Sequence, residues 1–184
     1  ALDFLRLILP DEGLKCVAVV ENRRFTHKFF TAFEEMAAFI STQDALGKTV
    51  YHACASYKTG ENRKQSNVLG AKAFWLDIDA GAGKPYADAE EAARAVLSFV
   101  RAVALLPPVL VASGSGVHSY WPLLEKVGFA DWTCRATALK RLCAAHGLHA
   151  DGSRTADMAS ILRTPGTHNR KGDNECIVRW GGPV

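Results

Sequence analysis

The chain has 184 residues, of which 48% are hydrophobic, and a formal net charge of +3. This is enough to bury a hydrophobic core, and we expect one domain over residues 1–184, built as two lobes that share one core. No run of about 18 uncharged apolar residues is present, and Asp3 and Asp11 stand where a signal peptide is basic. The five cysteines form no CxxC pair, which indicates reduced thiols, so we predict a cytoplasmic protein with no membrane partner. The absence of an initial methionine leads us to expect a fragment of a longer protein.

Hydrophobic periodicity predicts a mixture of strands and helices along the chain. The expected strands cover residues 16–21, 49–57, 71–79, 149–151 and 175–180, with a hairpin over 108–125, and the expected helices cover 29–46, 86–105, 130–148 and 155–162. Because the elements are mixed and include a hairpin, we predict an α+β (mixed α/β) fold whose sheet is not purely parallel.

The strand that includes FWLDID carries two acids among bulky apolar residues. Side chains alternate along a strand, so Trp75, Asp77 and Asp79 share one face, and the two aspartate Cα atoms lie about 6–7 Å apart. Two neighbouring carboxylates repel unless a cation or a proton lies between them, and hard oxygen ligands suit Mg²⁺ or Mn²⁺. We therefore predict a divalent cation site; the alternative is two acids that cap a strand end in water. For Trp75 we expect core packing, with stacking on a nucleobase as the alternative.

The predicted hairpin turns at SGSG, and His118 follows the turn directly. Glycines let a phosphate approach the backbone closely, and a histidine at that point can bind phosphate or transfer a proton. The alternative for His118 is a histidine that is hydrogen-bonded within the sheet. Ser113 and Ser115 either form the turn or donate hydrogen bonds to phosphate.

Two loops are rich in cationic and hydrogen-bonding side chains. The first, KTGENRKQSN, follows residue 57 and carries a single acid. The second surrounds a Pro-Gly turn near residue 165 and offers the side chains of Arg163, His168, Asn169, Arg170 and Lys171. Loops of this composition suit a polyphosphate or a nucleic-acid backbone, and the alternative is a solvated surface loop.

Taken in order, FWLDID, SGSGVHSYW, HAD and ILRTPGTHNRKG resemble the motifs of the archaeo-eukaryotic primase superfamily, in particular its phage and plasmid primase-polymerase (prim-pol) branch. The resemblance spans residues 63–172. Members of that family carry an Asp-x-Asp strand, a histidine motif on a hairpin and a third aspartate, and many phage members add an RxPGTxNxK loop. The resemblance implies the primase-polymerase fold, with an RRM-like catalytic mixed sheet flanked by helices, within a longer replication protein.

The resemblance also implies roles for the matched residues. Asp77, Asp79 and Asp151 would be the catalytic carboxylates and would hold two Mg²⁺ or Mn²⁺ ions, with Asp157 as the rival of Asp151. We prefer Asp151 because the family places this acid directly after a transition from helix to strand. His118 would contact the phosphates of the substrate, a nucleoside triphosphate (NTP or dNTP). One departure from the pattern is Gly116, where the family often has serine.

Residue chemistry and the resemblance together assign the remaining contacts. The assigned nucleotide and phosphate ligands, besides His118, are Ser113, Ser115, Arg163, His168, Asn169 and Lys171. The assigned DNA contacts are Lys58, Arg63, Lys64, Lys72 and Arg170. The implied partners are a single-stranded DNA template, a primer strand and a helicase domain or protein.

The predicted function is that of a DNA primase and polymerase in phage or plasmid replication, which transfers nucleotides from nucleoside triphosphates to a 3′-hydroxyl on a template. Two alternatives stay open. One is a metal-dependent nuclease or phosphodiesterase, because acids with a histidine also hydrolyse phosphodiesters. The other is a catalytically inactive module that binds a replication origin or single-stranded DNA. The sequence leaves open the choice between ribo- and deoxyribonucleotides, and between de novo priming and extension.

Overall fold

The computed structural model of the chain describes residues 1–171 and 175–181, so Gly172, the last residue of the motif-bearing range, lies outside the described residues. The helices are α1 (Leu2–Ile8), α2 (Phe33–Ala45), the short 3₁₀ helix η1 (Gln65–Asn67), α3 (Ala89–Ala102), α4 (Phe129–Ala145) and α5 (Gly152–Thr155). The strands are β1 (Leu14–Glu21), β2 (Arg24–Phe30), β3 (Thr49–Tyr57), β4 (Val68–Asp79), β5 (Val109–Ala112), β6 (Gly116–Val127), β7 (Ile161–Arg163), β8 (His168–Asn169), β9 (Cys176–Ile177) and β10 (Arg179–Trp180).

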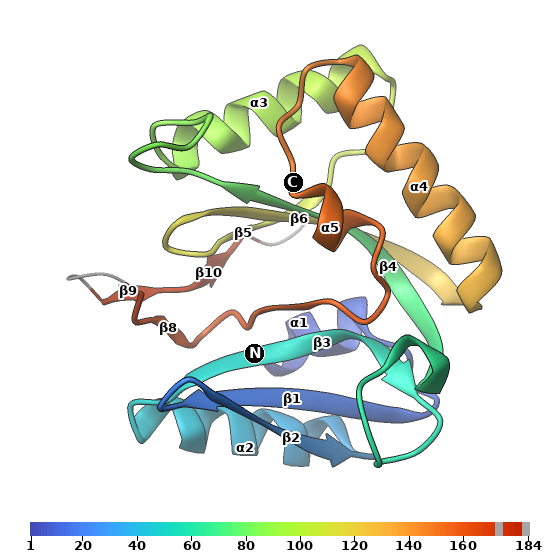
Figure 1. Ribbon diagram of the computed structural model, residues 1–184, viewed down its shortest axis with the longest axis vertical. Helices are drawn as coiled ribbons and strands as arrows, with labels where there is room; N and C mark the ends of the chain where they lie inside the picture. Colours follow the sequence, from blue (N-terminus) through green and yellow to red (C-terminus); the bar gives the residue numbers. More distant parts are fainter. Residues whose placement is uncertain (172–174, 182–184) are drawn as a thin grey trace.

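The strand β4 belongs to both halves of the main sheet. The strand order over the described residues is β10-β5-β6-β4-β3-β1-β2, with β7 paired to β3, and the pairings between these strands are antiparallel. The first residues of β4 pair with β3, through Gly70 and Ser56, whereas the residues from Ala71 to Asp79 pair with β6. Beyond Gly70, β3 and β4 therefore part, and the two halves of the sheet open away from each other (Figure 1).

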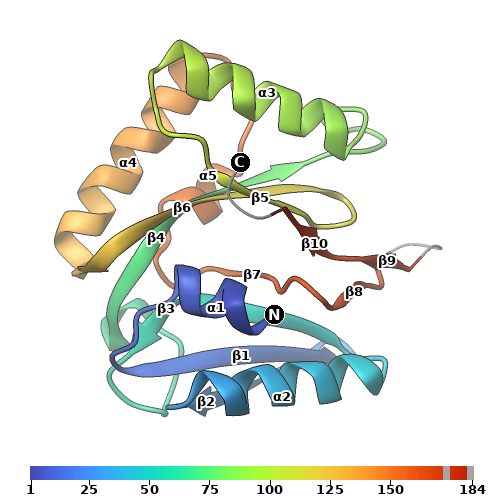
Figure 2. The same cartoon turned by 180° about the vertical axis from the view of Figure 1, so that it is seen from behind.

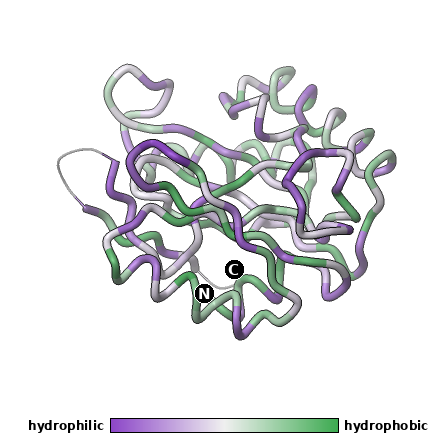
Figure 3. The backbone as a smooth tube through the Cα atoms, turned by 60° about the horizontal axis from the view of Figure 1, so that its bottom comes forward, coloured by the Kyte–Doolittle hydropathy of each residue, from purple (hydrophilic) through white to green (hydrophobic). Residues whose placement is uncertain are grey.

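Helices cover the outer side of each half. In Figure 1, α2 lies below β1, β2 and β3, while α3 and α4 lie over the half formed by β4, β5 and β6. Hydrophilic and hydrophobic segments alternate along these helices (Figure 3), as expected for helices with one face on a core. The segment from β7 to β8 runs between the two halves in both opposite views (Figures 1 and 2). The predicted α+β class is thus confirmed, with an antiparallel sheet rather than a mixed one.

The side chains of β4 separate into two cores, as the alternation predicted. Trp75 is fully buried in the larger core, whereas Leu76 and Ile78 belong to the second core under α3. The Trp75 ring packs 4.6 Å from that of Trp132 on α4, and its Nε1 donates to the carbonyl of Arg154 at 2.9 Å. Core packing of Trp75 is confirmed, because a buried indole with its N–H already bonded has no face for a nucleobase.

Several local predictions were wrong, for identifiable reasons. The strand β2 was missed because almost all of its side chains are exposed and carry no hydrophobic alternation. No strand forms at residues 149–151, since Asp151 caps α5 instead, accepting a hydrogen bond from the N–H of Ser153 at 2.8 Å. The helix expected over 155–162 is replaced by α5 and by the strand β7. None of the helices in the described part of the chain has the length and apolar character needed to span a bilayer.

The departure at Gly116 has a steric cause. Gly116 pairs with Asp79 at the start of β6 and has φ of 144°, and a Cβ added there would lie 2.0 Å from the carbonyl oxygen of Ile78. Neither serine nor alanine fits without a shift of the backbone that carries Asp79. Glycine at this position therefore lets β6 approach the end of β4.

Replacing this glycine tests the close approach. Gly116→Ala should lower the free energy of unfolding by roughly 2–4 kcal/mol, because a backbone shift must relieve the clash. Gly60→Ala is the control, since a Cβ there meets only ordinary contacts of 3.7 Å or more. Urea denaturation of both variants measures the effect. Equal stability of the two variants would contradict the steric argument.

Candidate active site

The register of β4 and β6 brings the first two site residues together. Asp77 pairs directly with His118, and Nε2 of His118 lies 3.5 Å from Oδ1 of Asp77. The His118 ring is almost fully buried, and burial, followed by the charge of Arg163, lowers the pKa of His118 to about 3. His118 is therefore a neutral imidazole at physiological pH. Its Nδ1 is buried and has no hydrogen-bond partner.

Asp151 joins this pair through its backbone. The N–H of Asp151 donates to the carbonyl of Asp77 at 2.7 Å, which attaches the start of α5 to the end of β4. Burial raises the pKa of the Asp151 carboxyl, but hydrogen bonds from Ser153, together with a hydrogen bond and the charge of Arg154, outweigh burial, so that the pKa lies below its usual value. The carboxyl is therefore ionised beside the β4 acids.

Electrostatic repulsion links the three carboxylates. The Asp77 pKa is raised to about 6, first by burial and then by the negative charges of Asp79 and Asp151. A carboxyl in this position holds a proton more tightly than in water unless a cation compensates it. The three acids thus form one electrostatic group, although Asp151 is 72 residues from Asp79 (151 − 79) in the sequence.

Lys84 supplies part of the missing positive charge. Its Nζ lies 2.6 Å from Oδ2 of Asp79, in the turn that follows β4. The hydrogen bond to Asp79 and the charge of that carboxylate raise the pKa of Lys84, and Asp151 and Asp77 contribute to the rise. Lys84 is not among the residues predicted from the sequence, although a lysine in the Gly-rich turn directly after the Asp-x-Asp strand was a visible signal.

A cleft of about 250 Å³ lies where the two sheet halves part. Its lining contains eight of the residues singled out from the sequence, namely Asp77, Asp79, Ser113, Ser115, His118, Asp151, Arg163 and Lys171. It also contains Phe25, Tyr51 and Arg154, which sequence reasoning did not select. Phe25 and Tyr51 were missed because β2 was missed and because an aromatic residue on a strand is more often part of a core.

Arg163 faces the acids from the opposite sheet half. It pairs with Tyr51 across β7 and β3, and its guanidinium lies 5.1 Å from the centre of the Tyr51 ring. Arg163 is only 8% exposed, and its Nη1 is buried without a hydrogen-bond partner. A buried donor without a partner costs about 1–3 kcal/mol, and an anionic ligand in the cleft would remove this cost.

Asn169 acts on the cleft indirectly. Its Nδ2 donates to the carbonyl of Ser113 at 2.8 Å and lies 3.4 Å from Oγ of Ser115, and its Oδ1 accepts from the N–H of Lys171 at 3.0 Å. Because Asn169 is buried and its groups are occupied, it supports the Gly/Ser turn before His118 instead of presenting donors to the cleft.

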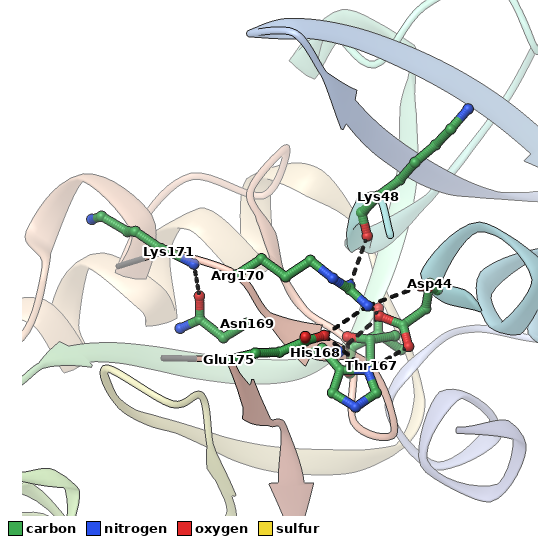
Figure 4. A network of polar contacts seen from close by, with 9 residues as sticks. Asp44, Lys48, Thr167, His168, Asn169, Arg170, Lys171 and Glu175 are labelled. Carbon is green, nitrogen blue, oxygen red and sulfur yellow. Dashed lines mark hydrogen bonds and ion pairs between the residues drawn. The ribbon is translucent and has the colours of Figure 1, made fainter. Parts of the chain in front are cut away.

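Three other predicted phosphate and DNA contacts are not brought to the cleft. His168 and Arg170 both bind Asp44 on α2, with distances of 2.7 Å from Nδ1 and Nη1 to the carboxylate oxygens (Figure 4). Lys72 lies beside Asp11 and Arg6, away from the candidate acids.

The basic loop after β3 also lies outside the lining of the cleft. Arg63 donates to the carbonyl of Ala159, and Lys58 donates to that of Ser66. Lys64 is exposed. Asp157, the rival of Asp151, accepts hydrogen bonds from Gln65 and from the N–H of Ala159, and it does not line the cleft.

The donor chemistry of the acids fits a divalent cation, but their side chains are not gathered around one point. Among the described residues, no three acid, histidine or cysteine side chains are arranged so that they could hold a metal ion as they stand. Asp79 is turned toward Lys84. Three carboxylates offer the hard oxygens that Mg²⁺ and Mn²⁺ prefer, and binding would require Asp79 to exchange Lys84 for the ion.

The pH dependence of stability tests the environment of Asp77. Because its folded pKa is raised, Asp77 contributes stability below about pH 4 that is lost as the pH rises through about 6. In the presence of a chelator, Asp77→Asn should reduce the loss of unfolding free energy between pH 4 and 7.5 by on the order of 2–3 kcal/mol. Asp131→Asn, an exposed control, should follow the wild-type profile. If the free energy of unfolding depends on pH in the same way for wild type and Asp77→Asn, the pKa of Asp77 is not raised.

No protein-family model and no curated protein matches the sequence. Solved structures are similar to it. The AEP domain of the cyanophage S-2L primase-polymerase is 17% identical, with a TM-score of 0.62 over 94% of this chain and 82% of that chain. The primase RepB′ is 15% identical, with a TM-score of 0.60 over 92% of this chain and 51% of that chain. The catalytic domain of RepB′ in complex with initiator DNA is 16% identical, with a TM-score of 0.58 over 91% of this chain and 76% of that chain.

This chain thus spans about half the length of the longer RepB′ chain. The similarity extends over nearly all of the chain at low sequence identity, which is a likeness of fold. The chain shares the fold of the archaeo-eukaryotic primase and primase-polymerase domains.

Proposed function

We propose that this chain is the catalytic domain of a DNA primase-polymerase, which transfers nucleotides from nucleoside triphosphates to a 3′-hydroxyl on a single-stranded DNA template. The fold supports this proposal, because the similar structures are named as a primase-polymerase and as a primase. The chemistry of the cleft supports it independently. A role in phage or plasmid replication, in a longer protein, is part of the same proposal.

One observation carries the proposal: both signs of charge line a single cleft. The acids Asp77, Asp79 and Asp151 lie in its lining together with Arg163 and His118, each of which has a buried nitrogen without a partner. A nucleoside triphosphate with its divalent cation carries the complementary charges, since the cation meets the carboxylates and the phosphates meet the donors. A ligand of only one sign would leave half of the cleft uncompensated.

In this proposal, Asp77, Asp79 and Asp151 hold Mg²⁺ or Mn²⁺. When bound, such ions lower the pKa of an attacking hydroxyl and neutralise the charge on phosphate oxygens. Arg163 and Lys171 bind the triphosphate as cations. Neutral His118 donates one hydrogen bond to a phosphate oxygen, and its burial keeps it from adding a charge of its own.

The reaction is a substitution at phosphorus. The 3′-hydroxyl oxygen forms a bond to the α-phosphorus and loses its proton to the solvent, and the bond from that phosphorus to the oxygen that bridges the α- and β-phosphates breaks. Pyrophosphate leaves with the electron pair of the broken bond. Negative charge moves toward the leaving pyrophosphate in the transition state, so the positive charge of Arg163 stabilises the transition state more than the bound substrate.

The template is proposed to follow the basic loop after β3. Lys58 and Lys64 are exposed there, with Lys58 bonded to the carbonyl of Ser66 and Arg63 to that of Ala159, so a phosphate backbone would compete with these two carbonyls. Contacts of this kind give an affinity that falls with salt and depends little on sequence.

Incorporation of labelled ATP and dATP, on templates with and without a primer, tests the function. Wild type with Mg²⁺ or Mn²⁺ should lengthen or initiate strands, and Asp79→Asn should lower the rate by roughly 100-fold or more because a carboxylate ligand is lost. Asp157→Asn is the matched control and should keep most of the activity, since Asp157 does not line the cleft.

Three results would contradict the proposal in different ways. Shortening of DNA without nucleotides would indicate a nuclease. Salt-sensitive DNA binding without any metal-dependent turnover would indicate an inactive binding module. Activity that survives in Asp79→Asn but disappears in Asp157→Asn would show that Asp157, and not Asp79, is needed at the metal site.

A second variant tests the cationic side of the cleft. Arg163→Gln should raise the KM for the nucleotide by roughly tenfold or more, because a charge-assisted contact to phosphate is lost. Arg94→Gln, an exposed arginine on α3 paired with Glu90, is the matched control and should leave KM unchanged. Steady-state incorporation at varied nucleotide concentration measures both. If Arg163→Gln has the wild-type KM, Arg163 does not bind the nucleotide.

A further inference from the structure

The last loop of the site divides its side chains between two directions. Strand alternation places His168 and Arg170 on one side of the segment and Asn169 and Lys171 on the other. Figure 4 shows Arg170 directed toward Asp44 and Lys171 directed away from it. The first pair binds α2, while Asn169 supports the Ser113–Ser115 turn and Lys171 lines the cleft.

Asp44 receives a dense set of hydrogen bonds from this segment. Its Oδ1 accepts from the N–H of His168 at 2.8 Å and from Nη1 of Arg170 at 2.7 Å, and its Oδ2 lies 2.7 Å from Nδ1 of His168. Arg170 also donates to the carbonyls of Asp44 and Lys48, at 2.9 and 3.1 Å. Glu175 adds a second acid, 2.9 Å from Nη2 of Arg170. Nδ1 of His168 and the guanidinium of Arg170 are therefore occupied within the protein.

The helix α2 gains little from Asp44 by itself. Asp44 lies in the last turn of α2, where the helix dipole disfavours a negative charge, and no basic residue of α2 compensates it. Asp44 is only 7% exposed. Burial raises its pKa, but the hydrogen bonds from Arg170 and His168 outweigh burial and hold the pKa below its usual value. The carboxylate is stable there because of its partners in the loop.

The same segment reaches the catalytic side. Asn169 lies in the sequence between His168 and Arg170, the two residues that bind Asp44. Its side-chain amide donates to the carbonyl of Ser113 and accepts from the N–H of Lys171. A Cβ added at Gly114 would lie 3.0 Å from Asn169, so the turn before His118 packs closely on this side chain. A displacement of residues 168–170 would therefore move both Lys171 and the Gly/Ser turn.

We infer that Asp44 is a positioning residue for the cleft: by binding His168 and Arg170 it holds the 168–171 segment so that Asn169 supports the Gly/Ser turn and Lys171 faces the phosphates. The contacts of Asp44, His168, Asn169 and Arg170 do not depend on the proposed function, whereas the assignment of phosphates as the ligand of Lys171 rests on it. Asp44 itself does not touch the cleft.

Binding of inorganic tripolyphosphate, measured by titration calorimetry, tests the inference without requiring polymerase activity. Asp44→Ala should weaken binding by roughly tenfold, because several hydrogen bonds that place Lys171 are lost. Asp44→Asn, which keeps an acceptor for the His168 N–H but loses the ion pair, should have an intermediate effect. Glu35→Ala, an exposed acid on the same helix, is the matched control and should bind like wild type.

A double-mutant cycle separates positioning from general destabilisation. If Asp44 acts through Lys171, the losses in Asp44→Ala and Lys171→Ala should not add, and the double variant should bind about as weakly as the weaker single variant. Additive losses, or an Asp44→Ala protein that binds tripolyphosphate like wild type, would overturn the inference. Arg170→Gln provides the same test from the other partner if Asp44→Ala fails to fold.

Kinetics distinguish this inference from the proposed function. In nucleotide incorporation, Asp44→Ala should raise KM with a smaller change in kcat, whereas a purely structural defect would lower the amount of active protein and leave KM unchanged. A wild-type protein that binds tripolyphosphate but never incorporates nucleotides would refute the proposed function and leave the role of Asp44 supported by the binding data alone.

Discussion

The double pairing of β4 is the constraint on which the site depends. The first residues of β4 form hydrogen bonds with β3, and its residues from Ala71 onward pair with β6. After Gly70, β4 therefore has no partner strand on its β3 side among the described residues. Asp77 and Asp79 lie on the part of β4 that has separated from β3. The gap between these two strands lets the carboxylates reach solvent, although β4 is a central strand of the sheet. The close approach of Gly116 to Ile78 then brings His118 beside Asp77.

Opposed charges lie on the two walls of this opening. Burial raises the pKa of Asp77, repulsion from Asp79 and Asp151 raises it further, and Lys84 relieves part of the repulsion at Asp79. Across the cleft, Arg163 is buried over Tyr51 without a full set of partners. Each wall is electrostatically incomplete by itself. A ligand that carries both a cation and a polyanion completes both walls at once.

The lower sheet half is connected to this chemistry through α2 and the 168–171 segment. Figure 4 shows how the loop is attached to the last turn of α2, so that a helix on the outside of the sheet determines the position of residues near the cleft. A second buried contact lies nearby, where Nδ1 of His52 on β3 is 3.3 Å from Oγ1 of Thr164. The loop is thus bonded to the protein on both of its flanks, which suits a segment that must present donors at fixed positions.

The sequence by itself determined the α+β class, the faces of β4 and the hairpin that carries His118, because alternation and turn residues are local signals. It also singled out eight residues that line one cleft, seven of them because their chemistry is unusual in its local context and Asp151 through the resemblance to the primase superfamily. Only the tertiary structure decided that Asp151, not Asp157, lies beside the β4 acids, that Lys84 pairs with Asp79, and that His168 and Arg170 bind Asp44. These contacts join residues up to 126 positions apart in the sequence. A loop rich in hydrogen-bond donors indicates that an anion will bind there, but the loop sequence does not show whether that anion is a carboxylate of the protein or a ligand.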